Sequence, residues 1–140
     1  MHGNALGGGL ELALASTIRI CSENSSFAFP EIDLDIIPGW HGIFRAANVM
    51  GASRTAYLAL SGQKIDANLA MQWNLVDFCL PLDAFAEFST KTALNIATKP
   101  VAASNSIKNV LSKQIHERKD VGYGMFLDLM QKHSTMDDAG

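Results

Sequence analysis

The sequence predicts an α/β fold in which strands and helices alternate first and helices alone follow. Two observations predict it. Short runs rich in β-branched and aromatic residues end at turn residues up to about position 80, and apolar residues recur at helical spacing after that. At 140 residues the chain is long enough to bury a core. We therefore expect a mixed core in residues 1–80 and a helical region in residues 81–140.

The first forty residues contain one predicted helix and two predicted strands. Leu10–Ser16 is apolar on nearly every face, which is typical of a buried helix. Thr17–Cys21 alternates and is rich in β-branched residues, so it is predicted as a strand. Phe27–Phe29 is a second short strand, because Pro30 cannot continue a hydrogen-bonded ladder. The Pro-Gly pair at positions 38 and 39 marks a turn.

The remainder is predicted to be mainly helical. Ser53 and Asp66 are candidate N-caps, and Pro100 ends a helix because the residue before a proline disfavours helical geometry. The predicted elements are the helices Trp40–Val49, Ser53–Leu60, Asp66–Trp73, Asp83–Thr98, Val101–Ile115 and Val121–His133, and a strand at Leu75–Leu80.

Composition narrows the classes of function. The hydrophobic share of 48% and the charged share of 18% are typical of a globular domain and not of a disordered chain. With a net charge of −3 and no basic run, we expect no nucleic-acid partner. No apolar run approaches the roughly 20 residues needed to cross a bilayer, and no signal peptide is recognisable. We therefore expect no membrane partner and a cytoplasmic location.

Cysteine and histidine usage agrees with this interpretation. Cys21 and Cys79 are flanked by apolar residues, which is typical of buried, reduced thiols in a cytosolic protein. The four histidines lie far apart and form no HExxH pattern, so we expect no metal site. No pattern predicts a redox cofactor.

The most informative motif is the glycine run that includes Gly7 and Gly8 and leads to Glu11. Glycines allow a tight turn and a close approach of the backbone to a ligand. Because a predicted helix follows, the glycines lie at its N-terminus, where unpaired backbone N–H groups can bind a negatively charged oxygen. A second carboxylate, Glu31, follows Pro30. An oxyanion site beside two carboxylates indicates acid–base chemistry next to a carbonyl group.

Three segments also carry a family resemblance. The chain resembles the crotonase (enoyl-CoA hydratase/isomerase) superfamily in HGNALGGGLELALAS, FAFPEIDLDIIPGWHG and MGASRTAYLALSGQKIDANLAMQWNLVD, which occur in the family's order between about His2 and Asp77. The resemblance covers the central and C-terminal portion of such proteins. It implies a partial ββα spiral followed by a helical C-terminal trimerisation region. It also implies a homotrimer or hexamer, with an N-terminal segment supplied in trans as one alternative.

The resemblance implies roles for individual residues. Gly8 matches the glycine whose N–H forms half of an oxyanion hole, and Gly7 lies in the same turn. Glu11 matches the first catalytic glutamate, a general base on water. Glu31 matches the second, which exchanges a proton with the substrate's α carbon. Gly39 matches a glycine whose amide places the catalytic water, with an ordinary Pro-Gly turn as the alternative.

The chain departs from the family pattern at several positions. Asp35 stands where glycine is common, so we expect a reshaped pocket or a different backbone angle. Trp40 replaces a small residue and is expected to narrow the acyl pocket. His41 is an additional acid–base candidate, with a packing or surface role as the alternative. Asn74 also replaces a common glycine, and Thr17 a common aspartate.

Both glutamates together favour one reaction of the family. Adding water to a 2-enoyl-CoA thioester requires a base at the β carbon and a proton at the α carbon, which two carboxylates can supply. We therefore expect a hydratase-like lyase whose substrate is an acyl-CoA, with coenzyme A as part of the substrate and no separate cofactor. The alternatives are an isomerase, decarboxylase or C–C hydrolase acting on an acyl-CoA, and a non-catalytic assembly module.

Overall fold

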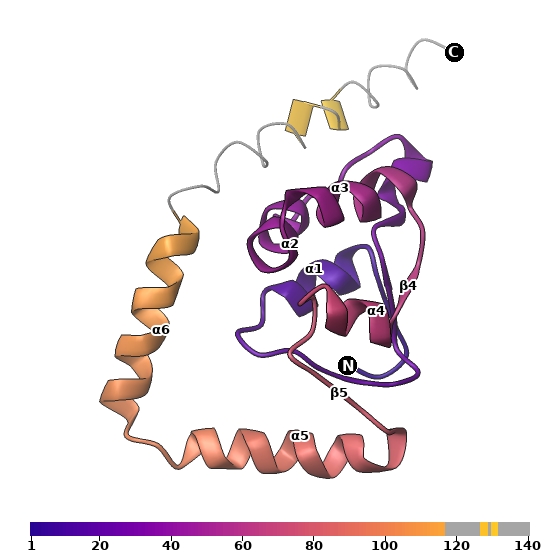
Figure 1. The fold of residues 1–140 in the computed structure, drawn as a ribbon. Coiled ribbons are helices and arrows are strands. Elements are labelled where there is room, and N and C mark those ends of the chain that lie inside the picture. The colour runs from indigo at the N-terminus through magenta and orange to yellow at the C-terminus, as the bar shows by residue number, and fades with distance from the viewer. Residues whose placement is uncertain (117–126, 129, 132–140) are drawn as a thin grey trace.

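The structure is a computed structural model that describes residues 1–116, 127, 128, 130 and 131. Its first part alternates short strands with short helices, and its last two helices are long (Figure 1). The strands are β1 (Asn4–Leu6), β2 (Ile20–Ser22), β3 (Ser26–Ala28), β4 (Ile65–Asp66) and β5 (Phe78–Leu80). The helices are α1 (Gly8–Leu14), the 3₁₀ helix η1 (Pro30–Leu34), α2 (Gly42–Met50), α3 (Ala52–Ser61), α4 (Ala67–Gln72), α5 (Leu82–Ala97) and α6 (Val101–His116).

The strands form two small sheets. In the first sheet β3 lies between β1, to which it is parallel, and β4, to which it is antiparallel. In the second sheet β2 and β5 are parallel, with Cys21 opposite Cys79. Both cysteines are free thiols, and burial, followed by the neighbouring Cys79, raises the pKa of Cys21 to about 12. A thiol with so high a pKa stays protonated and unreactive at neutral pH.

The hydrophobic core lies where α1, the strands and α2–α4 meet. Its centre is Phe27 and Phe29 on either side of the end of β3, both with no exposed surface. The alternation of a strand explains why Phe27 and Phe29 share a face, and Pro30 then turns the chain into η1. The other core residues are Ala5, Leu10, Leu14, Cys21, Ala46, Met50, Leu58, Ile65, Ala67, Ala70, Leu75 and Val76.

Helices α2 and α3 pack against each other, α2 also packs on α1, and α3 packs on η1 (Figure 1). Gly51 separates them with a φ of +85°, a conformation that glycine adopts at little cost. The predicted N-cap Ser53 is therefore wrong, because α3 begins at Ala52 with Gly51 as its cap. The predicted cap at Asp66 is confirmed, since its side chain accepts a hydrogen bond from the Leu69 N–H at 2.7 Å.

The end of α4 shows why Asn74 can stand where glycine is common. Asn74 has a φ of +64°, its N–H donates to Met71 O at 3.1 Å, and the Leu75 N–H donates to Ala70 O at 2.9 Å. These two bonds form a Schellman motif, whose penultimate residue must be left-handed. Asparagine adopts that conformation more readily than other residues with a Cβ atom.

We expect Asn74→Gly to raise the free energy of unfolding by about 0.5 kcal/mol and Asn74→Ala to lower it by about 1 kcal/mol, because only alanine meets the full steric cost of a positive φ. Urea denaturation of the three proteins measures both changes. Equal effects of the two substitutions would contradict the assigned conformation.

One buried charged side chain connects the two parts of the second sheet. Arg19, 8% exposed, donates from Nε to Leu75 O at 2.7 Å and from Nη1 to Ser16 O at 3.0 Å. Its backbone N–H donates to Asp77 Oδ2 at 2.6 Å, and its Nη2 lies 3.5 Å from Asp77 Oδ1. Arg19 thus joins the end of α1 to the segment that enters β5.

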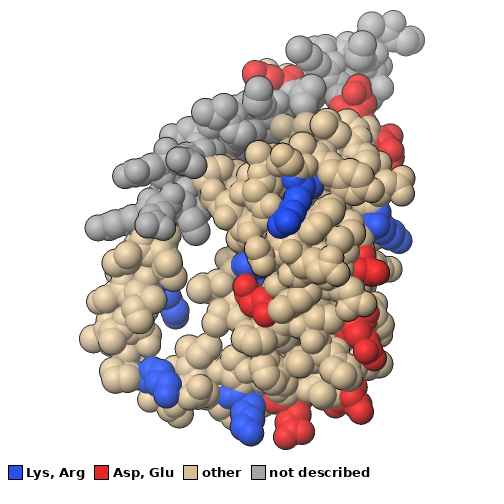
Figure 2. Space-filling model, in the orientation of Figure 1, with Lys and Arg blue, Asp and Glu red and all other residues tan. Residues whose placement is uncertain are grey.

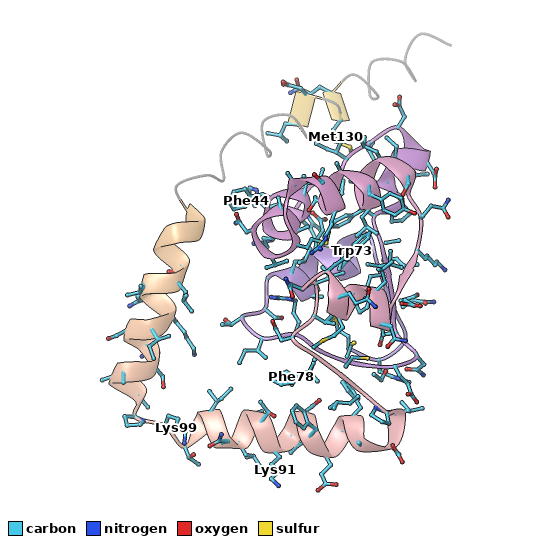
Figure 3. The ribbon with its side chains drawn as sticks, in the orientation of Figure 1. Phe44, Trp73, Phe78, Lys91, Lys99 and Met130 are labelled. Carbon is cyan, nitrogen blue, oxygen red and sulfur yellow. The ribbon has the colours of Figure 1, made fainter. Side chains whose placement is uncertain are left out.

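Helices α5 and α6 extend away from the core as two successive arms (Figure 1). α5 contacts β2, and Phe78 of β5 points toward it (Figure 3), with its ring 5.2 Å from that of Phe88. α6 exposes Val101, Ile107 and Val110. The predicted ends of these two helices are confirmed to within one or two residues, whereas the predicted helix Val121–His133 lies mostly outside the described residues.

Several short elements differ from the prediction. The strand expected at Thr17–Cys21 is confined to β2, and the strand expected at Leu75–Leu80 to β5. The elements β1, β4 and η1 were not predicted at all. The helix expected at Leu10–Ser16 begins earlier, at Gly8, and is not buried on every face, since Leu12 is 72% exposed. Among the described residues, no helix is long and apolar enough to span a membrane.

Candidate active site

The glycine turn leads directly from β1 into α1. Gly7 is the N-cap of α1 with a φ of +52°, and its N–H donates to Ala28 O of β3 at 3.0 Å. Gly8 is the first residue of the helix, so its N–H has no carbonyl partner within the helix. A Cβ atom on Gly7 would lie 2.9 Å from Oε1 of Glu31. The positive φ favours glycine at position 7, and the absence of a side chain there leaves room for the Glu31 carboxylate.

Glu11 lies in the first turn of α1 and is only 3% exposed. Its Oε1 accepts hydrogen bonds from the backbone N–H groups of Trp40 and Gly42, each at 2.8 Å. A Cβ atom on Gly42 would lie 2.6 Å from Cγ of Glu11, so the carboxylate packs directly on this second glycine. Two backbone donors thus satisfy one oxygen of a buried acid, as burial of a polar group requires.

Glu31 lies in the first turn of η1, immediately after the buried end of β3. Its Oε1 packs against Gly7, and its Oε2 is buried without a hydrogen-bond partner among the described residues. Burial raises the pKa of Glu31, the charge of Glu11 raises it further, and Glu31's own backbone amide opposes the increase. The net shift favours the protonated form of Glu31 relative to a carboxyl group in water.

The two carboxylates and the glycine turn form one site. Glu31 packs on Gly7, and the charge of Glu11 reaches Glu31 strongly enough to influence its pKa. The Trp40 ring covers Gly8, because a Cβ atom there would lie 3.3 Å from Cζ3 of the indole. The indole is nonetheless 66% exposed, so it forms an outer wall of the site.

Asp35, Gly39 and His41 lie in the segment that leads from η1 to α2. Asp35 is the C-cap of η1 and has a left-handed φ of +56°, a conformation that aspartate adopts more readily than most residues with a Cβ atom. The amides that hold Glu11 are those of Trp40 and Gly42, and no such bond joins Glu11 to Gly39 within the described part of the chain. His41 is the left-handed N-cap of α2.

Two residues of the site were missed from the sequence. Gly42 and Arg45 contribute through a backbone N–H and through a bond to Trp40 O, respectively. Backbone donors leave no signature in a residue pattern, and an arginine in a helix is usually a surface residue. No sequence signal distinguished them.

Two surface hollows lie away from these residues. One of about 780 Å³ runs along α5 beside Thr90 and Leu94, and one of about 260 Å³ lies between Ile18 and Phe85. Neither is lined by Glu11 or Glu31. On the face in Figure 2, acidic side chains gather along one edge of the core and basic ones are dispersed. Among the described residues, no cluster of three His, Cys, Asp or Glu residues is arranged to hold a metal ion.

Comparison with protein families gives a match over nearly the whole chain. A family model described as "Enoyl-CoA hydratase/isomerase" matches residues 1–139. All of the candidate residues, from Gly7 to Arg45, lie within this match.

Individual relatives agree with the family match. The chain is 39% identical to the "Probable enoyl-CoA hydratase 2, mitochondrial" of Arabidopsis thaliana over 82% of its own length and 38% of that protein. It is 36% identical to the "2,3-dehydroadipyl-CoA hydratase" of Escherichia coli K12, over 79% of its own length and 44% of that protein. The chain therefore spans less than half the length of these two relatives.

Solved structures show the same fold. A crystal structure of an enoyl-CoA hydratase from Mycobacterium avium superposes with a TM-score of 0.87 at 26% sequence identity. The superposition covers 97% of this chain and 61% of that one. The backbone arrangement described above is thus that of the corresponding part of an enoyl-CoA hydratase.

Proposed function

Because this chain belongs to the enoyl-CoA hydratase/isomerase family, we propose that its site adds water to a 2-enoyl-CoA thioester, or catalyses the reverse dehydration. The observation that carries the proposal is the convergence of Glu11 and Glu31 on the glycine turn at the start of α1. One carboxylate can take a proton from water while the other supplies one to carbon.

The proposed mechanism assigns each group one task. The Gly8 N–H holds the thioester oxygen as the enolate develops, and losing one such donor typically costs about 100- to 1,000-fold in rate. Glu11 accepts a proton from water as the water oxygen bonds to the β carbon. Glu31, whose raised pKa favours its protonated form, donates a proton to the α carbon. We place the second oxyanion donor and much of the CoA contact outside this sequence.

In this proposal, the residues around the two carboxylates shape the space that the acyl group occupies. Trp40, whose ring covers Gly8, narrows the space for the acyl chain in this proposal. Gly7, Asp35, Gly39 and His41 complete the substrate-facing turns. Both relatives described above are named as hydratases, which favours hydration over isomerisation, decarboxylation or C–C cleavage. Coenzyme A enters as part of the substrate, and no separate cofactor is part of the proposal.

The assembly and location remain proposals as well. We propose a homotrimer or hexamer, because α6 exposes several large apolar side chains, among them Val101, Ile107 and Val110, that a partner subunit would cover. A cytoplasmic location is proposed from the sequence alone, and one relative is named as mitochondrial.

The test is isothermal titration with acetoacetyl-CoA at a measured oligomeric mass, together with turnover of crotonyl-CoA. We expect a trimeric or hexameric mass and saturable binding that is weakened by Glu11→Ala. Glu23→Ala is the matched control, because Glu23 is an exposed acid on a turn of the same core. Products other than the 3-hydroxyacyl-CoA would favour another reaction of the family. A folded oligomer that binds no acyl-CoA would instead support the non-catalytic assembly module.

A further inference from the structure

Among the described residues, hydrogen bonds hold the carboxylate of Glu11 at one of its two oxygens. Both backbone donors, the N–H groups of Trp40 and Gly42, bond to Oε1, and neither reaches Oε2. An oxygen that already accepts two hydrogen bonds is a poorer proton acceptor than its neighbour. The arrangement therefore distinguishes the two oxygens chemically and fixes the orientation of the carboxylate.

The turn that carries these donors has an unfavourable backbone. His41, between Trp40 and Gly42, has a φ of +64°. A left-handed residue between two others directs neighbouring N–H groups to one side, which creates a concave anion site of the kind called a nest. For a residue with a Cβ atom this conformation costs roughly 1–2 kcal/mol. Other contacts must therefore stabilise the turn.

Arg45 supplies those contacts from the first turns of α2. Its Nη1 donates to Trp40 O at 2.5 Å, and its backbone N–H donates to His41 O at 2.9 Å. These carbonyls belong to the two peptide groups on either side of the His41 Cα atom. The bond to His41 O is the first backbone bond of α2, which any non-proline residue at position 45 makes. The contribution particular to arginine is the Nη1 bond to Trp40 O, which restrains the peptide group between Trp40 and His41 and so the turn that carries both donors.

We infer that Arg45 is a positioning residue that braces the Trp40–His41–Gly42 turn, so that Oε1 of Glu11 stays bound and Oε2 is the oxygen that exchanges a proton with water. This inference rests on the proposed role of Glu11 as the base. It adds to that role a named oxygen and a residue that never contacts the substrate.

The test compares Arg45→Met, which keeps the length of the side chain but removes the donor, with Arg45→Lys, which keeps a donor. Arg54→Met is the matched control, because Arg54 is an exposed arginine on the neighbouring helix α3. Two quantities are measured: the amide proton shifts of Trp40 and Gly42, assigned by their response to Glu11→Gln, and the kcat and KM for crotonyl-CoA.

We expect Arg45→Met to move both amide signals and to lower kcat roughly 10-fold with little change in KM, because the misplaced base reacts poorly while binding is retained. Arg45→Lys should restore part of kcat, and Arg54→Met should change neither quantity. Unmoved amide signals or an unchanged kcat in Arg45→Met would overturn the inference.

A second variant protects the test against misfolding of Arg45→Met. His41→Val disturbs the same turn by another route, since a β-branched residue strongly disfavours a positive φ. It should move the same two amide signals and lower kcat, and an undisturbed turn in this variant would count against the inference. If the wild-type protein hydrates no enoyl-CoA, the proposed function fails, while the amide signals still decide whether Arg45 braces the turn.

Discussion

Replacing Glu31 with glutamine is expected to lower kcat for crotonyl-CoA hydration by roughly 100- to 10,000-fold, the usual contribution of a general acid or base. Glutamine has nearly the same shape, so the packing against Gly7 and the buried position of the second oxygen atom are preserved in outline. What is lost is the exchangeable proton. Steady-state kinetics of the two proteins measure the effect.

The same substitution has an opposite effect on stability. The pKa of Glu31 is raised above its ordinary value of 4.5, mainly by burial, so the native state holds the proton to a higher pH than the unfolded chain does. Native stability therefore falls as pH rises through the window between 4.5 and the raised pKa. Glu31→Gln removes that loss, so we expect a higher melting temperature than wild type at neutral pH and no difference below pH 4.5.

A matched control separates these effects from general charge removal. Glu23→Gln removes the charge of an exposed acid on the turn between β2 and β3. It should leave both kcat and the melting temperature unchanged. The kcat/KM of the wild type should fall as pH rises past the pKa of Glu31, because the donor form is lost. A Glu31→Gln variant with wild-type kcat would remove Glu31 from the mechanism.

The helices were predictable because their patterns are long. α5 and α6 each contain 16 residues with recurring apolar positions and a proline between them, so their ends fell within two residues of the prediction. β1 was not predictable, since three residues such as Asn4–Leu6 are too few for an alternation to be recognised. Its register comes from pairing with β3, which is a tertiary contact.

The residues of the candidate site also fall into two groups: those that a sequence pattern indicates, and those that only tertiary contacts reveal. Gly8, Glu11 and Glu31 could be named as candidates from the sequence, because each stands in a recognisable motif: a glycine run for Gly8 and Glu11, and a Pro-Glu pair for Glu31. The donors to Glu11 were not found, because Trp40 and Gly42 act through backbone N–H groups and any residue has those.

Substituting Arg19 with methionine is expected to lower the free energy of unfolding by about 2–3 kcal/mol, chiefly because the buried Leu75 carbonyl loses its donor. The bond from Arg19 Nε to Leu75 O is buried and 2.7 Å long. Within the described part of the chain, no backbone N–H outside the helices and strands donates to the Leu75 carbonyl in its place. Methionine matches the volume of the stem but supplies no N–H. Urea denaturation measures the change.

The ion pair of Arg19 with Asp77 should matter much less than the bond to Leu75. The Nη2–Oδ1 distance is 3.5 Å and the Asp77 side chain is 38% exposed, so water screens the attraction. Asp77→Asn keeps an oxygen that can accept from the Arg19 backbone N–H while removing the charge, so it should cost less than about 1 kcal/mol. A cost of Asp77→Asn equal to that of Arg19→Met would show instead that the charge pair holds β2 and β5 together. A small cost would leave the Arg19–Leu75 hydrogen bond as the contact that joins the end of α1 to the segment before β5, and with it the support for the helix that presents Glu11.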